Sequence, residues 1–331
     1  MKEYLVDVPV RVNVWIRPEA QRKQFDVIKQ ARPSILFLVS DGPRNERERA
    51  LLTMSRAIVE DIDWKCTVHK IYEEQNNGLY AMSKKGLEYI YNHVDRIIAL
   101  EDDHIPAISF FRFCAELLEK YKDDERILYI SGMNYLGHYD KPDSDYFFSS
   151  IGSVWGTAIW KRSAYQDVDL SIVENNYIKE LFKESSKTNK KYYFARKYLN
   201  NRMHKTYLAH GEFRRQFKQI TQNQLIIVPT KNMISNVGAV EDSANADKLN
   251  NLPRGIRKVF HLKTYEYDFP LKHPKYMMLD TYYVKKARII MGFGYPHISV
   301  FRKIERGFLL IKNGEFMKFK NKIKKALNRN N

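Results

Sequence analysis

The sequence is poor in cysteine: Cys66 and Cys114 are the only two in 331 residues. Two cysteines are too few for a disulfide framework or for a zinc cluster built on thiolates. Both lie in apolar surroundings, so we expect them to be buried thiols of a cytosolic protein.

Long apolar runs are absent as well. No window approaches the roughly 18 consecutive apolar residues that a membrane span requires. Residues 1–15 pass directly into the alternating pattern of a strand and lack the regions of a secretory signal. We therefore expect a cytoplasmic protein, either free or peripheral on the inner face of the cell membrane.

Acidic residues are scarce only toward the end of the chain. The net charge is +17, and the part from Arg254 onward has 19 Lys and Arg against five acids, a net of +14. No zinc-finger, RNA-recognition or helix-turn-helix signature accompanies these charges, so nucleic acid is not an expected partner. The rise in charge predicts a boundary between a main domain, residues 1–252, and a basic, partly helical C-terminal extension, residues 253–331.

The main domain alternates strand-like and helix-like segments, and a hydrophobic content of 44% is enough for a core. We expect strands at Val6–Trp15, Ile35–Val39, Cys66–Ile71 and Arg96–Leu100, and helices between them at Glu19–Ala31, Arg47–Ile62 and Leu79–Tyr91. This pattern predicts an α/β fold with a doubly wound, Rossmann-like sheet, in which ligands bind beyond the carboxyl ends of the strands.

Three adjacent acids, Glu101-Asp102-Asp103, directly follow one of these apolar strands. In an arbitrary loop such a triplet is more often an ordinary solvated turn. At the end of a buried strand the carboxylates repel one another unless they are solvated, protonated or bound to a cation. Carboxylate oxygen is the ligand that Mg²⁺ and Mn²⁺ prefer, so the triplet predicts a site for a divalent cation.

The run from Ile97 to Asn134 that contains the triplet resembles a family of bacterial glycosyltransferases with the GT-A fold. More distantly it resembles the N-acetylglucosaminyltransferase I group, which carries the same Glu-Asp-Asp. The resemblance continues in patches from about Val10 to Asp242. It implies a mixed GT-A sheet and transfer of a hexosyl or N-acetylhexosaminyl group from a nucleoside-diphosphate sugar, with a UDP-sugar favoured and Mn²⁺ or Mg²⁺ as the cofactor.

The resemblance also implies roles for the residues around the triplet. Asp103 would be the direct metal ligand, and Glu101 and Asp102 would contact the ribose and base side of the nucleotide. Arg17, at the end of the first strand, would lie against the diphosphate. Without the family, Arg17 reads equally well as a surface cation.

Two further segments would line the nucleotide. Asp41, after the second strand, would hydrogen-bond the base, and Asn77-Gly78 would form part of the neighbouring loop. On its own, Asp41 is also a favourable acid near the start of a helix.

The segment Ser149–Trp160 resembles the family's Trp-Gly segment, which lines the cleft between donor and acceptor. We assign this function to Trp155 and Gly156, because an aromatic ring can stack on a sugar. For Trp160 a place in the core is as good an interpretation.

An inverting transferase needs one carboxylate to take the proton of the acceptor hydroxyl. The best candidate is Glu212, where the family usually has Asp at the start of a helix, followed by residues that include Trp. Here Phe213 and Arg214 follow, and a glutamate at a helix start is also favourable with the helix dipole alone.

The segment Asn232–Asp242 resembles the family's closing motif. Family members often continue with Thr-His-Thr, which could supply a histidine to the metal or diphosphate, but residues 243–246 read Ser-Ala-Asn-Ala. His261 or His273 are candidates to substitute, although a lone histidine is more often an ordinary core or surface residue. Metal dependence could accordingly be weaker here than in the family.

From Phe316 the sequence predicts a helix with apolar residues on one face and lysines over most of the rest. Such a helix suits an anionic membrane surface. A solvated basic tail, or a helix packed on the domain, explains the same pattern equally well.

The leading hypothesis is a metal-dependent, inverting glycosyltransferase of surface polysaccharide biosynthesis that acts on a glycan or polyprenyl-linked acceptor. A catalytically inactive sugar- or membrane-binding protein with a transferase-like fold is the alternative. We set aside a nucleotidyltransferase, because Ile16–Glu19 lacks the glycine-rich loop that those enzymes show after the first strand.

Overall fold

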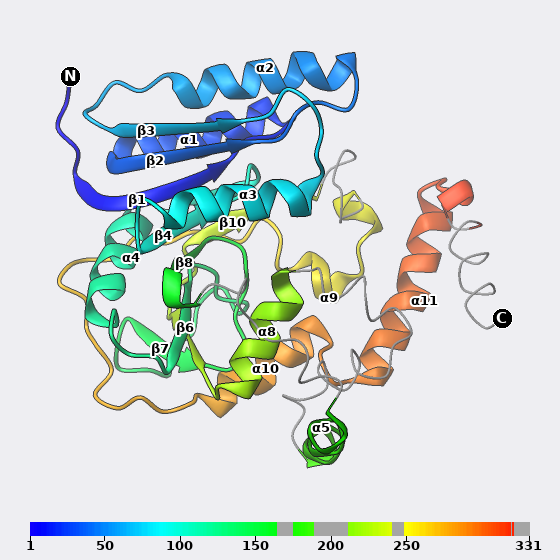
Figure 1. Ribbon diagram of the computed structural model, residues 1–331. Helices are drawn as coiled ribbons and strands as arrows, with labels where there is room; N and C mark the ends of the chain where they lie inside the picture. Colours follow the sequence, from blue (N-terminus) through cyan, green and yellow to red (C-terminus); the bar gives the residue numbers. More distant parts are fainter. Residues whose placement is uncertain (164–174, 189–210, 240–247, 319, 321–331) are drawn as a thin grey trace.

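The computed structural model describes residues 1–163, 175–188, 211–239, 248–318 and 320 (Figure 1). Its centre is an eight-stranded mixed sheet in the order β3-β2-β1-β4-β8-β6-β9-β7. The strands are β1 Val6–Asn13, β2 Pro33–Ser40, β3 Thr67–Tyr72, β4 Arg96–Leu100, β6 Ile127–Ser131, β7 Tyr146–Ser149, β8 Thr157–Trp160 and β9 Leu225–Pro229.

Strands β1 to β4 are parallel, so their carboxyl ends meet at one edge of the sheet. Strand β8 lies antiparallel between β4 and β6, and β7 is antiparallel to β9. A separate two-stranded ribbon pairs β5, His104–Pro106, with β10, Ile234–Asn236. This ribbon starts directly after the acidic triplet and fixes the chain beyond it.

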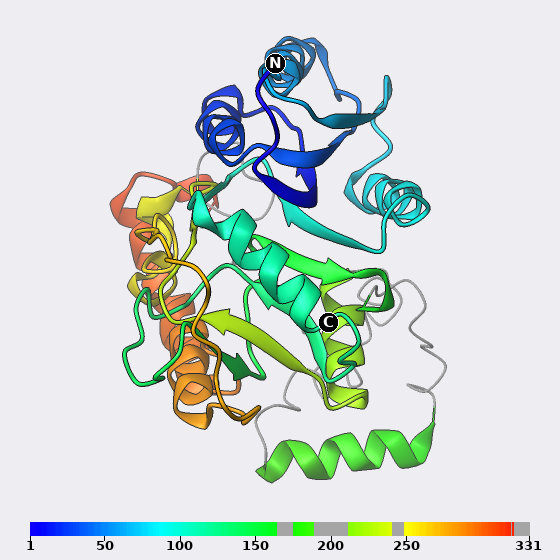
Figure 2. The ribbon, with the colours of Figure 1, turned by 90° about the vertical axis from the view of Figure 1, so that its left-hand side faces the viewer.

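Helices cover both faces of the N-terminal half of the sheet; Figure 2 shows α1 on one side of the strands and α3 on the other. The helices are α1 Pro18–Ala31, α2 Glu46–Glu60, α3 Leu79–Tyr91, α4 Ser109–Lys120, α5 Asn176–Thr188, α8 Gly211–Thr221, α9 Arg254–Arg257, α10 Thr281–Met291 and α11 Pro296–Lys312. Short 3-10 turns occupy Lys161–Ser163 and Leu249–Asn251.

The burial of the strands follows from their sequences. In β2 the run Leu36–Val39 is buried on both faces, as a continuous apolar strand between two helical layers requires. Helix α4 turns Phe110, Phe113 and Leu117 into the core. Trp160 is also a core residue, and its indole N–H donates to the Leu118 carbonyl at 3.0 Å.

The predicted α/β, Rossmann-like fold with a mixed sheet is confirmed, and it is consistent with the GT-A type. The expected pair of buried thiols is right for Cys114, whereas Cys66 is only half-buried. Even so, burial raises the pKa of the Cys66 thiol to about 12.

Residues beyond position 252 contribute to the same hydrophobic core as the sheet. Val259, Leu271 and Tyr283 are all buried within it, and the Tyr283 hydroxyl accepts the Tyr135 amide at 3.1 Å. The boundary after residue 252 stays a prediction. Most of the predicted C-terminal helix, residues 319 and 321–331, lies outside the described residues.

Candidate functional site

A cleft of about 690 Å³ opens at the carboxyl ends of β1, β2 and β4. Its lining includes Arg17 after β1, Asp41 after β2, and the triplet Glu101–Asp103 after β4. The parallel strands therefore bring together three groups of predicted site residues that are far apart in sequence.

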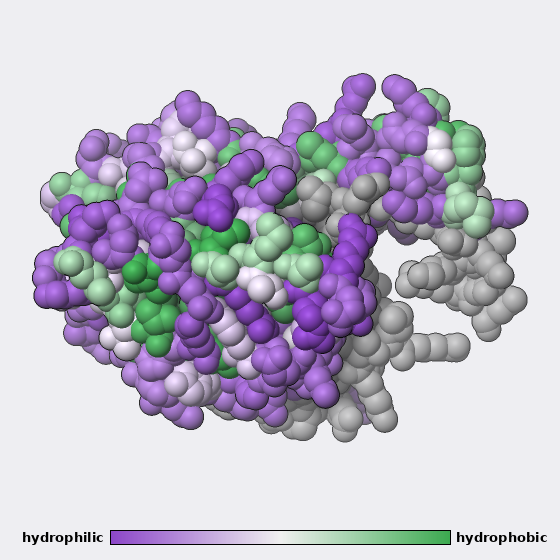
Figure 3. Space-filling model, turned by 90° about the horizontal axis from the view of Figure 1, so that it is seen from above, coloured by the Kyte–Doolittle hydropathy of each residue, from purple (hydrophilic) through white to green (hydrophobic). Residues whose placement is uncertain are grey.

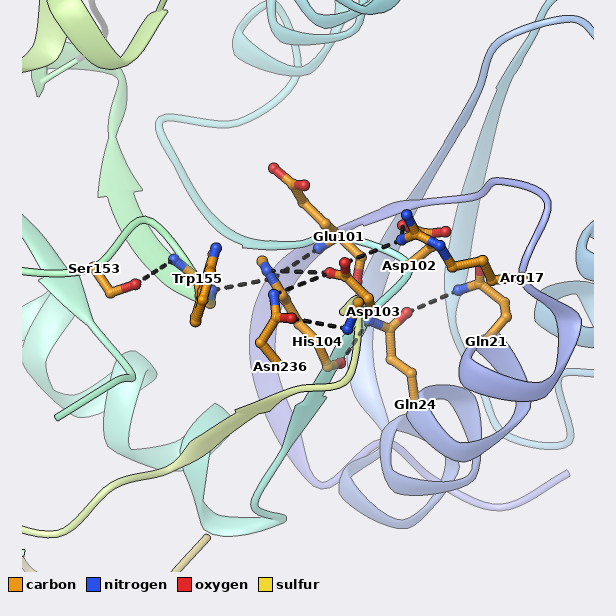
Figure 4. Close-up of polar contacts among 12 residues, drawn as sticks. Arg17, Gln21, Gln24, Glu101, Asp102, Asp103, His104, Ser153, Trp155 and Asn236 are labelled. Atoms are coloured by element: carbon orange, nitrogen blue, oxygen red, sulfur yellow. Dashed lines mark hydrogen bonds and ion pairs between the residues drawn. The ribbon is translucent and has the colours of Figure 1, made fainter. Parts of the chain in front are cut away.

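Arg17 holds two of the three acids (Figure 4). Its Nη1 donates to Asp102 Oδ1 and to Asp103 Oδ2, both at 3.0 Å. Burial is the main cause that raises the pKa of Asp102 to about 7; the Arg17 charge lowers it, and the neighbouring acids raise it further. Asp102 Oδ2 is buried without a hydrogen-bond partner in the structure. Arg17 thus lies against the acids at the edge of the cleft, and its contact with a diphosphate stays a prediction.

Two buried glutamines of α1 form a hydrogen-bonded chain that ends on the acidic turn. Gln24 Nε2 donates to the carbonyls of Glu101 and His104, at 2.5 and 2.7 Å. Gln21 Nε2 in turn donates to Gln24 Oε1 at 2.8 Å. Both side chains are fully buried. Sequence reasoning missed them, although polar glutamines at inward positions of an amphipathic helix are a usable signal.

His104 is buried and connects the acidic turn to the Trp155-Gly156 turn. Its Nδ1 accepts the backbone amides of Glu101 at 3.1 Å and Gly156 at 3.2 Å. In a neutral imidazole the other nitrogen, Nε2, then carries the proton. Nε2 lies 3.4 Å from Asp103 Oδ1, although not in hydrogen-bonding geometry. His104 was not among the predicted site residues.

The end of β10 and the residues that follow it pack against Asp103. Asn236 Nδ2 donates to Asp103 Oδ1 at 3.4 Å, and Asn236 Oδ1 accepts the Gly238 amide at 2.9 Å. A Cβ atom added at Gly238 would lie 1.8 Å from Asp103 Oδ2. Only glycine therefore fits beside this carboxylate as it stands.

Glu101, Asp103 and His104 form a cluster that could hold a metal ion, with one potential ligand atom from each within 4.8 Å of the others. Two carboxylates suit a hard divalent cation. Because His104 Nδ1 accepts two amides, Nε2 of the neutral ring carries the proton and has no lone pair for a metal. This arrangement favours a role for His104 in positioning the acidic turn over direct ligation. The unpartnered buried oxygen of Asp102 beside the cluster is a further group that a cation would stabilise.

The two histidines considered as substitutes have different surroundings. His261 is exposed, and its backbone amide donates to the Asn236 carbonyl at 3.0 Å. His273 lies against the Tyr146 hydroxyl at 3.0 Å and is 3.5 Å from Glu116. Neither belongs to the candidate cation cluster.

The carboxylate of Asp41 holds the loop that follows β3. Oδ1 accepts the amides of Gly42 and Asn77, and Oδ2 accepts the Gly78 amide, each at 2.9 Å. The Asn76 side chain adds a fourth bond at 3.1 Å. A carboxylate has about four acceptor sites, so little capacity is left for a base. Asn76 and Gly78 line the cleft, whereas Asn77 is not among the lining residues.

The cleft is lined by several cations besides Arg17, namely Arg11, Arg44 and Arg47. Glu48 binds Arg44, and this hydrogen bond is the main cause that lowers the pKa of Glu48. Guanidinium groups are well suited to diphosphate oxygens. The resemblance assigned no role to these three arginines, although clustered arginines near strand ends are a usable sign of a phosphate site.

Trp155 lines the cleft, whereas Gly156 beside it is buried and is not among the lining residues. Trp155 is half-exposed, lines the cleft, and lies against the Phe260 ring with 4.9 Å between centroids. Gly156 has a φ of +60°, and a Cβ there would approach Ile234 to 2.4 Å. The glycine is thus required by both its backbone conformation and its surroundings.

No family model and no curated protein matches this chain. Among solved structures, the crystal structure of mannose-1-phosphate geranyltransferase from Thermus thermophilus is similar to it. The identity is 12% and the TM-score 0.26, over 70% of this chain and 75% of that chain. A similarity at this level carries no functional argument.

A second cavity of about 230 Å³ shares Trp155 with the cleft. Its lining includes Tyr129, Arg215 and Arg288. The Arg215 guanidinium lies 5.5 Å from the centroid of the Tyr129 ring, and burial lowers the pKa of Arg288. The Trp155 indole therefore lines both the cleft and the second cavity.

Glu212 stands in the first turn of α8, as predicted for a residue at a helix start. Its side chain lies outside the described part of the chain. The helix itself reaches the second cavity through Arg215, Gln216 and Gln219. Its role as a base stays a prediction.

Proposed function

We propose that this protein is a metal-dependent glycosyltransferase that moves a sugar from a nucleoside-diphosphate sugar, most simply a UDP-sugar, to a glycan or polyprenyl-linked acceptor. The observation that carries the proposal is the setting of Asp103. Its carboxylate stands at the end of a central strand, bound by Arg17 and Asn236 and packed on Gly238. It faces a cleft lined by further arginines.

Glu101 and Asp103 would hold the divalent cation, Mn²⁺ or Mg²⁺. When bound, such a cation neutralises the negative charge that develops on a departing nucleoside diphosphate. The chain's own cations, with Arg17 first among them, would bind the remaining diphosphate oxygens. The loop held by Asp41 would cover the base, while Asp102 would lie toward the ribose.

The acceptor would enter from the second cavity, past Trp155. There the indole face can stack on a sugar ring, and Gly156, packed against Ile234, holds the turn that positions it. Glu212 at the start of α8 would take the proton of the acceptor hydroxyl while its oxygen attacks the anomeric carbon from the face opposite the departing diphosphate. Such a single displacement inverts the configuration of the sugar. We place the enzyme in surface polysaccharide biosynthesis, on the cytoplasmic side of the membrane.

Transfer or donor hydrolysis, measured with a panel of nucleotide sugars and Mn²⁺, tests the proposal. We expect turnover with at least one donor, its abolition by a chelator, and a loss of about 100-fold or more in Asp103→Asn. Asp123→Asn, a change at an exposed acid after α4, is the matched control and should keep full activity. Nucleotide binding without any turnover would favour the inactive alternative.

A further inference from the structure

Helix α11 presents its apolar residues to solvent. Phe301, Ile304 and Phe308 are each 66% exposed, and Val300 and Ile311 are exposed as well. Spacings of three and four residues put these positions on a single helical face. Leu310 is the one buried residue of this helix. We call this outward set, Val300, Phe301, Ile304, Phe308 and Ile311, the α11 apolar face.

The side of α11 that faces the protein combines Leu310 with polar residues that hydrogen-bond to neighbouring segments. Arg302 donates to the carbonyls of Ile289 and Ile290 at the end of α10. The carboxylate of Glu305 accepts the Arg254 amide at 3.0 Å. These bonds fix the rotation of the helix, so the apolar face is turned outward by specific contacts.

Asn313, just beyond the helix, adds a further anchor, because its Nδ2 donates to Asn251 Oδ1 at 2.7 Å. The helix is therefore held at its middle and just beyond its C-terminal end. In Figure 3 the end of the molecule that carries this helix shows apolar, green side chains among hydrophilic ones. Contiguous exposed apolar patches on a soluble surface mark sites of interaction.

The surrounding charge identifies the class of partner. Lys303 and Lys312 are exposed on the two sides of the α11 apolar face, and the chain from Arg254 onward carries a net charge of +14. A second copy of this chain would bring two such basic segments together, which is electrostatically unfavourable. Anionic headgroups above an apolar interior match both the charge and the phenylalanines.

None of the helices in the described parts of the chain combines the length and apolar character that a bilayer crossing needs. We propose that α11 lies flat on an anionic lipid bilayer, with the α11 apolar face inserted at the interface and its lysines among the headgroups. The proposal does not depend on the transferase activity. Figure 1 shows α11 on the side toward which the parallel strands point, so docking there would bring the cleft's side of the molecule toward the membrane.

Co-sedimentation of the full chain with vesicles tests this proposal. We expect binding to vesicles of phosphatidylcholine with phosphatidylglycerol, weaker binding to phosphatidylcholine alone, and a decrease with added salt. The double variant Phe301→Ser, Phe308→Ser should bind at least about tenfold more weakly. Both phenylalanines are exposed, so their loss opens no cavity and the variant should fold with an unchanged melting curve.

The matched control is Leu5→Ser with Met54→Ser, two exposed apolar residues remote from α11 in sequence; it should bind as the unchanged chain does. Equal binding of the two double variants would overturn the proposal, since the α11 apolar face would then contribute nothing and other basic segments would explain the binding. Concentration-dependent self-association that the phenylalanine changes abolish, without vesicle binding, would overturn it in favour of a second copy of the chain.

Discussion

Both oxygens of the Asp103 carboxylate already have a neighbour that fixes them. Oδ2 accepts from Arg17 and packs on Gly238, and Oδ1 faces Asn236 and His104. A carboxylate fixed in this way loses little further freedom when it binds a cation, which is the advantage of a preorganised ligand. The surroundings of Asp103 therefore matter as much as the acid itself.

His104 gives a prediction for stability at the residue scale. In His104→Ala the buried amides of Glu101 and Gly156 lose their acceptor, which should lower the free energy of unfolding by about 3 kcal/mol. In His104→Asn the side-chain oxygen can replace Nδ1 for at least one amide, so the loss should be smaller. Denaturant unfolding of both variants measures this difference; equal losses would contradict the bridging role.

Gly238 gives a prediction for metal affinity. The backbone there is not in the left-handed region, so alanine is conformationally allowed, but its Cβ would displace the Asp103 carboxylate. We expect Gly238→Ala to weaken Mn²⁺ binding by about 10–100-fold while the chain stays folded. Titration with Mn²⁺ in the presence of a nucleoside diphosphate measures the effect, and an unchanged affinity would remove Asp103 from the ligand set.

At the scale of elements, the loop after β3 is bound mainly by one carboxylate, that of Asp41 just after β2. Four donors of the segments 42 and 76–78 converge on Asp41. Asp41→Ala should therefore raise amide hydrogen exchange at Asn77 and Gly78 by roughly tenfold or more. Asp41→Asn keeps one acceptor oxygen and should give an intermediate increase. Exchange that stays as slow as in the unchanged chain would show that the loop is held by other contacts.

Several secondary-structure elements could be predicted from the sequence alone. The strand at Arg96–Leu100 and the helix at Leu79–Tyr91 were predicted with the bounds that the structure has, because an apolar run or an amphipathic period is a local signal. The meeting of Arg17, Asp41 and Asp103 also follows from the sequence, since parallel strands end at a common edge.

Other features could not be predicted, because they depend on distant partners. The ribbon between β5 and β10 joins residues 104–106 to residues 234–236, and its short strands have no pattern of their own. Likewise nothing local indicates that Gln24 binds the turn after β4 or that Gly238 touches Asp103. The outward direction of the α11 apolar face could not be predicted for a related reason, because the rotation of a helix is set by its bonds to distant segments.

At the scale of the whole molecule, the charges are divided between two regions. Acids and arginines converge at the cleft, while the chain from Arg254 onward is strongly basic and carries the α11 apolar face. This division suits the proposed function, in which a water-soluble nucleotide would bind at one place and a lipid surface at another. Phe260 is one contact between the two regions, because it lies beyond residue 252 yet lines the cleft beside Trp155.

The central claim is that Asp103 helps to hold a divalent cation on which nucleotide binding depends. Calorimetric titration of the full chain with UDP, with and without Mn²⁺, tests it most directly, together with Asp103→Asn and the control Asp123→Asn. We predict Mn²⁺-dependent binding that Asp103→Asn abolishes and Asp123→Asn retains. Binding of the same strength in the presence of a chelator, or in Asp103→Asn, would contradict the account.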